Sequence, residues 1–177
     1  MTDATAVALS AIDKVIARDE IRDLLSRYSD GIDRCDEAAL KTVFWPDGRC
    51  DYGSFAGNAW EFATGVIAAL RDLRRTQHVI GNMVIDVQAP DRARGQTSVI
   101  AYHEMDDEQG RPIVRVVGGR YLDRFARRDG EWRIAERLYL MDWNQNQPGG
   151  SDFDGWIYGM LNKGERGPGD PSRGWFG

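Results

Sequence analysis

Apolar residues recur every three or four positions over the first fifth of the chain, which is the spacing of an amphipathic helix. This stripe predicts a helix over about residues 6–34. Asp36 has the residue type of a helix N-cap and stands before a second, short helix. A third helix is expected over about residues 58–73, and the run at residues 45–48, Trp-Pro-Asp-Gly, is typical of a turn.

The pattern changes after His78, where four segments rich in β-branched and aromatic residues follow one another. They cover about residues 76–87, 94–106, 113–127 and 131–143, and short turn signals separate them. Long strands joined by short turns predict an antiparallel meander. Helices followed by a meander predict an α+β domain, with the helices on one face of a curved sheet.

The chain is expected to divide into one domain at residues 1–146 and a tail at residues 147–177. The tail is rich in Gly and Pro but carries several aromatic residues, which a disordered segment rarely does. We therefore expect it to pack on the same domain or on a neighbouring subunit.

Composition excludes several classes of function. The net charge is −5 and the basic residues are scattered, so the chain lacks the clustered basic residues of a nucleic-acid-binding surface. No apolar run is long enough for a membrane span, and the first residues lack the features of a signal peptide. A cytoplasmic location is expected, and Cys35 and Cys50, which lack metal or redox spacing, fit it as reduced thiols.

Histidine is the first candidate for chemistry, because the chain contains only His78 and His103. Both fall on predicted strands, and strand alternation gives His103 apolar neighbours on its own face, which predicts that it points inward. A lone inward histidine is usually a satisfied core residue. A neutral imidazole can also take a proton near neutral pH and return it.

Asp33 and Arg137 are further candidates. Asp33 lies at the C-terminal end of the first apolar stripe, where a carboxylate gains nothing from the helix dipole. Arg137 and Arg120 lie on predicted strands, so each is either a surface residue or a buried cation that needs a carboxylate.

Two stretches resemble SnoaL-like members of the NTF2-like superfamily. One is Tyr28-x4-Asp33-x2-Asp36-x7-Phe44-x2-Asp47, and the other starts at Gly118-Gly-Arg-Tyr and runs to Trp-Arg-Ile at 132–134. The resemblance covers about residues 15–145. It is nearest to the dehydratase and dehydrohalogenase branch, which includes scytalone dehydratases, hexachlorocyclohexane dehydrochlorinases and bile-acid 7α-dehydratases. It implies three N-terminal helices packed on a strongly curved, mixed and mainly antiparallel sheet, forming a cone that holds a cofactor-free lyase site.

The resemblance also implies roles for individual residues. Asp33 and His78 match an Asp–His dyad, while Tyr28, Arg137 and His103 match polar catalytic positions. Tyr52 matches a tyrosine that positions the water to be lost, whereas Ile32 replaces a second tyrosine, which argues against scytalone as substrate. Pocket shape and substrate contacts are expected from Trp45, Phe55, Trp60, Met83 and Arg120.

The expected function is a dehydratase-type elimination on a small hydroxylated cyclic, aromatic or steroid-like substrate. Retro-aldol cleavage that releases formaldehyde, ketosteroid-type isomerisation and non-catalytic binding of a small ligand are the alternatives. No cofactor or metal is expected, although Asp33, His78 and His103 have the residue types of a two-histidine-one-carboxylate metal triad. An apolar outer sheet face at Trp132, Ile134, Leu138 and Leu140 predicts a homo-oligomer, either a trimer or a dimer.

Overall fold

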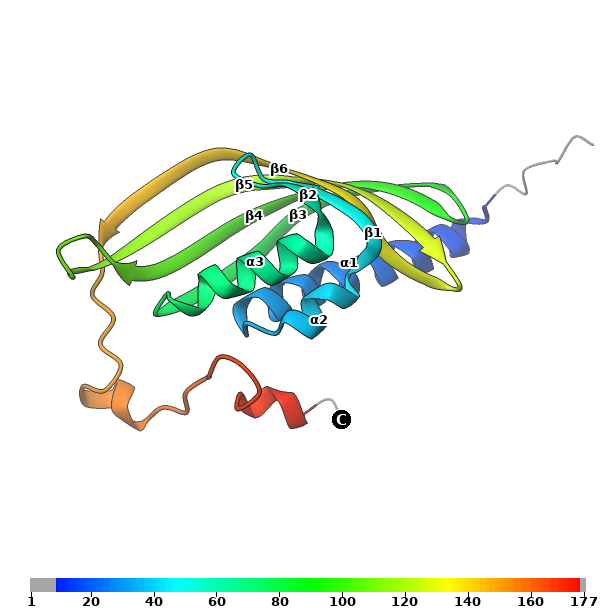
Figure 1. The fold of residues 1–177 in the computed structure, drawn as a ribbon. Helices are drawn as coiled ribbons and strands as arrows, with labels where there is room; N and C mark the ends of the chain where they lie inside the picture. The colour runs from blue at the N-terminus through cyan, green and yellow to red at the C-terminus, as the bar shows by residue number, and fades with distance from the viewer. Residues whose placement is uncertain (1–8, 176–177) are drawn as a thin grey trace, which may run out of the picture.

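A curved sheet of six strands covers three α-helices in the computed structural model, which describes residues 9–175 (Figure 1). The helices are α1 (Ala11–Asp33), α2 (Glu37–Thr42) and α3 (Ala59–Arg71). The strands are β1 (Phe44–Asp51), β2 (Ala56–Asn58), β3 (Arg75–Ala89), β4 (Arg92–Asp106), β5 (Pro112–Arg128) and β6 (Glu131–Pro148). Their order in the sheet is β2-β1-β6-β5-β4-β3. The pair β1–β6 is parallel and the others are antiparallel, which confirms the predicted α+β fold with a mixed, mainly antiparallel sheet. The sheet is not closed.

Each helix begins at the kind of cap that the sequence favours. Ser10 and Asp13 form a reciprocal capping box at α1, so the helix starts later than the predicted residue 6, which itself lies outside the described residues. Asp36 accepts a hydrogen bond from the backbone N–H of Ala39 and caps α2, as predicted. Asn58 caps α3. No helix within residues 9–175 is long and apolar enough to cross a membrane.

The hydrophobic core lies between the helices and the concave face of the sheet. Its largest fully buried side chains include Ile21, Leu24, Leu25, Tyr28, Phe44, Ile67, Phe125 and Ile134. They come from α1, β1, α3, β5 and β6, so the core joins the two halves of the chain. This packing fixes the end of α1 against the sheet.

The turn predicted at residues 45–48 is wrong, because these residues lie inside β1. The pairing of β1 with β6 shifts register between Phe44 and Arg49. Pro46 has no N–H to donate to the ladder, so the strand bulges there instead of ending. Gly48 is needed at the bulge, since a Cβ would lie 2.8 Å from the carbonyl oxygen of Trp45.

The predicted apolar outer face of β6 is also wrong in its first half. Trp132 and Ile134 are buried in the core, whereas Leu138 is 40% exposed. A register shift between Arg124 and Phe125 on β5 breaks the alternation of β6 at this point. Residues on the two sides of the shift therefore change faces, which simple strand parity does not anticipate.

The tail leaves β6 after Pro148 and returns beneath the helices to the C-terminal end of α1 (Figure 1). Arg34 donates hydrogen bonds to the carbonyl oxygen of Glu165 (3.0 Å) and to the carboxylate of Asp170 (3.2 Å). Arg166 donates to the carbonyl oxygen of Leu73 (2.7 Å). Polar contacts thus attach the tail beside Asp33, the last residue of α1.

Candidate active site

A cavity of about 250 Å³ lies between α1, α3 and the inner face of the sheet. Its lining is aromatic and aliphatic, with a small set of polar groups and, among the described residues, no Asp, Glu, Lys or Arg side chain. The lining residues are Tyr28, Ile32, Tyr52, Ser54, Phe62, Val66, Leu70, His78, Val99, Ala101, His103, Val117, Tyr121 and Tyr139. An apolar pocket with a few converging polar groups is the usual form of a small-molecule site.

The side chain of Asp33 is held by two hydrogen bonds from His78. The backbone N–H of His78 donates to Oδ2 of Asp33 at 2.7 Å, and Nδ1 of the ring lies 2.7 Å from Oδ1. The backbone bond is available because β3 is an edge strand, so one side of it is not paired with another strand. Both side chains are more than nine-tenths buried, so the geometry is fixed by packing.

The charge of Asp33 determines which ring nitrogen of His78 carries the proton. Burial acts to raise the pKa of Asp33, but the hydrogen bonds from His78 outweigh it and bring this pKa below its usual value. An ionised carboxylate accepts hydrogen bonds and cannot donate them, so Nδ1 of His78 is the donor. No hydrogen bond from the described residues reaches Nε2 of His78, which leaves its lone pair free for a substrate.

His103 stands next to His78 in the cavity wall. The two ring centroids are 5.5 Å apart and the rings meet edge to face at 87°. Burial, assisted by the neighbouring His78, lowers the pKa of His103 to about 4. His103 is therefore neutral at pH 7 and can donate or accept a hydrogen bond without carrying charge.

This low pKa predicts a pH dependence of stability. The unfolded chain binds a proton on His103 below about pH 6.5, whereas the folded chain does so only near pH 4. The contribution of neutral His103 to the free energy of unfolding is complete above pH 6.5. It is lost as the pH falls towards 4, by at most about 1.4 kcal/mol per pH unit for one proton. Urea unfolding from pH 7.5 to 4.5 should show a smaller loss of stability in His103→Gln than in the wild type. Equal losses in the two proteins would contradict the assignment.

Four tyrosines form the wall of the cavity nearest β5 and β6. The hydroxyls of Tyr28 and Tyr52 are 2.9 Å apart, and the rings of Tyr121 and Tyr139 pack around them. Burial raises the pKa of Tyr28, Tyr52 and Tyr121 well above the usual value, so all three stay protonated at neutral pH. One hydroxyl proton is used within the Tyr28–Tyr52 pair, and either hydroxyl can be its donor.

Loss of the Tyr28–Tyr52 hydrogen bond has a measurable expected cost. Tyr28→Phe leaves the Tyr52 hydroxyl without its partner and should lower the free energy of unfolding by about 1 kcal/mol. Tyr139→Phe is the matched control, because no hydrogen bond from the described residues reaches its hydroxyl, and it should change stability by about 0.5 kcal/mol or less. Chemical denaturation of both variants tests this difference, and equal effects would contradict it.

Arg137 lies behind this tyrosine wall and does not line the cavity, which corrects the expected catalytic contact. Its Nε and Nη2 donate to Asp123 at 2.7 and 2.8 Å, and both side chains are completely buried. The guanidinium stands 4.2 Å from the ring centre of Tyr28 and 3.9 Å from that of Tyr121. It therefore acts on the cavity through these two rings and through its positive charge, which acts to lower the pKa of Tyr52 as well.

The structure places most of the other predicted contact residues away from the cavity. Trp45 donates to the carbonyl oxygen of Ala126, Trp60 donates to that of Lys41, and Arg120 is paired with Asp142 on the outer face. Phe55 and Met83 pack against the core beside the lining without forming part of it. Of this set, only Tyr52 lines the cavity.

Several lining residues were not among the predicted site residues, including Phe62, Tyr121 and Tyr139. Tyr139 shares strand parity with Arg137, so a signal for it existed in the sequence. The partner of Arg137 was also missed. Asp123 pairs with Arg137 across β5 and β6, but this register depends on the irregularities in the hairpin.

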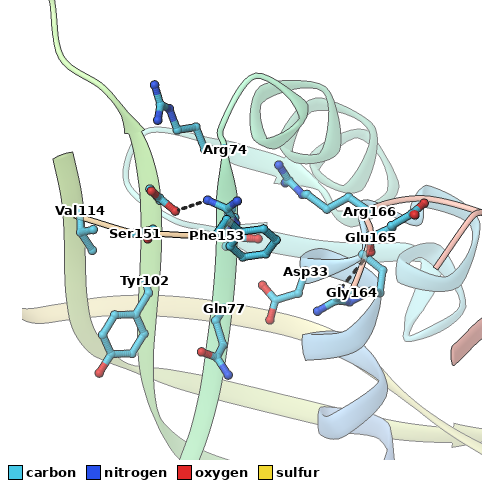
Figure 2. A pocket seen from close by; sticks show the side chains of 14 residues that line it. Asp33, Arg74, Gln77, Tyr102, Val114, Ser151, Phe153, Gly164, Glu165 and Arg166 are labelled. Atoms are coloured by element: carbon cyan, nitrogen blue, oxygen red, sulfur yellow. Dashed lines mark hydrogen bonds and ion pairs between the residues drawn. The ribbon is translucent and has the colours of Figure 1, made fainter. Parts of the chain in front are cut away.

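A larger outer groove of about 750 Å³ lies on the far side of the dyad. Figure 2 shows Asp33 beside this groove, between the strand that carries Gln77 and the tail segment that carries Arg166. The groove is rich in charged residues, including Arg34, Arg75 and Glu104, whereas the cavity lining has none. Asp33 therefore lies between an outer groove with several charged side chains and an inner cavity without Asp, Glu, Lys or Arg in the described part of its lining.

Comparison with known proteins found similar structures and one matching family. A putative scytalone dehydratase from Novosphingobium aromaticivorans superposes with a TM-score of 0.70 at 21% identity, covering 77% of this chain and 91% of that one. Hexachlorocyclohexane dehydrochlorinase LinA-type3 from Novosphingobium barchaimii gives 0.69 at 22% identity, covering 79% and 96%. A variant of Rv3472, a protein of unknown function from Mycobacterium tuberculosis, gives 0.63 at 24% identity, covering 76% and 78%.

At these identities the structural matches establish the fold alone, and the comparison with curated proteins found no match. The SnoaL-like domain model matches residues 13–138, which include Asp33, His78, α2, α3 and all but the first two residues of α1. The chain therefore belongs to the SnoaL-like family of the NTF2-like superfamily.

Proposed function

We propose that this protein is a lyase that removes a proton and a leaving group, most simply water, from a small hydroxylated ring compound. The observation that carries the proposal is the Asp33–His78 pair at the wall of a largely apolar cavity. Structural relatives described as a scytalone dehydratase and a dehydrochlorinase agree with elimination chemistry.

In the proposed reaction Nε2 of His78 removes the proton from the carbon next to the acidifying group. Asp33 accepts the hydrogen bond from Nδ1, holds the ring in this tautomer and stabilises the imidazolium that forms. The Tyr28–Tyr52 pair donates a hydrogen bond to the oxygen on which negative charge develops. The imidazolium then returns its proton to the departing hydroxyl, with neutral His103 alongside as a hydrogen-bond partner. The chain supplies every group that these reaction steps use, so the proposed reaction requires no cofactor.

The other candidate functions fit this arrangement less well. A ketosteroid-type isomerase needs a free carboxylate as base, but both oxygens of Asp33 are bound by His78. Within residues 9–175 no three His, Cys, Asp or Glu side chains are arranged to hold a metal ion, so the geometry gives the metal triad no support. Retro-aldol cleavage would use the same base and is distinguished by its product.

A substrate panel tests the proposal. Purified protein is incubated with hydroxylated one- and two-ring ketones and phenols, and the products are analysed by mass spectrometry. Loss of water from at least one compound is expected, and this loss should disappear with His78→Ala. Release of formaldehyde would instead indicate retro-aldol cleavage, and an unchanged mass with a shifted double bond would indicate isomerisation. Turnover that persists in His78→Ala would contradict the proposed base.

A further inference from the structure

Within residues 9–175, no Asp, Glu, Lys or Arg side chain lines the cavity that contains His78. Its polar lining consists of two histidines, four tyrosines and Ser54. The pKa of His103 is about 4, and the raised pKa values of Tyr28, Tyr52 and Tyr121 keep their hydroxyls protonated. Such a surface offers hydrogen bonds but, from the described residues, no carboxylate, ammonium or guanidinium group as a counterion.

The buried charges nearest the cavity each have a partner, although Nη1 of Arg137 makes no hydrogen bond to the described residues. Arg137 and Asp123 bind each other through two hydrogen bonds, behind the rings of Tyr28 and Tyr121. Asp33 is fully engaged by His78, and its negative charge would repel an anion. A carboxylate or phosphate that entered the cavity would lose its hydration and meet no lysine or arginine side chain in the described lining, which is costly in an apolar environment.

The volume of the cavity limits the size of the ligand. At about 250 Å³ it is less than twice the roughly 150 Å³ of an apolar cavity that holds one benzene molecule. One ring, or two fused rings with small polar substituents, fill such a space, whereas four fused rings exceed it. Steroids are therefore too large for the cavity as it stands.

We propose that the ligand of this site is an uncharged compound of one or two rings, and that the cavity rejects carboxylates and phosphates of the same shape. This inference rests on the cavity being the substrate site in the proposed function. It goes further by assigning charge and size selectivity to the cavity lining. Charged compounds are left to the outer groove beyond Asp33, whose lining contains four arginines, Arg34, Arg74, Arg75 and Arg166.

The test uses two probes of nearly equal shape, neutral 2-naphthamide and anionic 2-naphthoate. Isothermal titration at pH 7.5 should show saturable binding of the amide, and the naphthoate should displace it at least about a hundredfold less effectively, the loss expected for burying an unpaired charge. The four-ring ketone testosterone should not displace the amide. Equal competition by naphthoate or testosterone, or no binding of the amide, would overturn the inference.

Two kinds of variant locate the binding. Ala101→Leu fills the cavity from β4 and should weaken binding of the amide at least about tenfold, since the added atoms occupy ligand space. Leu70→Phe does the same from α3 if the first variant folds poorly. Gln77→Ala lies on the outer groove and should leave the affinity for the amide unchanged. Any naphthoate signal that survives cavity filling belongs to the groove, whereas amide binding that survives in both filled variants overturns the inference.

This test is separable from that of the proposed function, because binding needs no turnover. Selective binding of the amide together with no loss of water from any substrate would retain the inference and refute the lyase. Loss of water on a carboxylate substrate as efficient as on its neutral amide would refute the inference and retain the lyase.

Discussion

Replacing His78 by alanine is expected to lower kcat/KM by about 10²–10⁴-fold, which is the usual contribution of a positioned general base. The backbone N–H of residue 78 still donates to Asp33 in this variant, so the end of α1 keeps one of its two contacts with β3. The loss should therefore be in turnover and not in folding. Steady-state kinetics on the substrate found in the panel, with circular dichroism as a folding check, measure it.

Asp33→Asn sharpens this prediction. Asp33 acts through His78, and residues that work as a unit give non-additive effects. The double variant Asp33→Asn with His78→Ala should therefore be no slower than His78→Ala alone. Gln77→Ala is the matched control: it lies next to His78 on β3 but lines the outer groove, and should retain activity within about twofold. Multiplicative losses in the double variant would show that Asp33 and His78 act independently.

The second large effect is expected at the buried pair of Arg137 and Asp123. Asp123→Ala leaves a fully buried guanidinium without its carboxylate and should lower the free energy of unfolding by about 3–5 kcal/mol. The double variant Asp123→Leu with Arg137→Met removes both charges and should recover much of this loss, because apolar replacement of a buried pair is often neutral. Urea denaturation at pH 7 measures all three proteins.

A neighbouring exposed pair supplies the control. Arg124 and Glu136 lie opposite each other on the same two strands, 3.0 Å apart, with both side chains about 60% exposed. Glu136→Ala should change stability by about 1 kcal/mol or less. If Glu136→Ala costs as much as Asp123→Ala, burial is not what determines the effect of breaking an ion pair in this sheet.

The order of helices and strands was predictable because each element carries a local signal. The repeats of Ile21, Leu24 and Tyr28 indicated α1, and Asp36 marked the start of α2. The turn prediction at residues 45–48 failed because these residues form a bulge in β1, which only the parallel pairing with β6 explains. Local propensity cannot reveal a partner strand that lies about 90 residues later in the chain.

The candidate site was predictable in part. The contact between Asp33 and His78 was expected from a resemblance, and the structure places the two side chains within hydrogen-bond distance. The position of Arg137 behind Tyr28 could not be predicted from the sequence, because it follows from the irregular register of β5 and β6. The size of the cavity depends on how α3 packs against the sheet, and no spacing in the sequence encodes it.

The most direct test of the proposed base is the protonation pattern of the His78 ring, observed by long-range ¹H–¹⁵N correlation NMR of the free protein at pH 7.5. The chain has only two histidines, so His103→Gln assigns the spectrum. We expect a proton on Nδ1 of His78, held by Asp33, and a bare Nε2 available as base. A proton on Nε2 with Nδ1 unprotonated would contradict this assignment, since His78 could then take no proton from a substrate in the cavity.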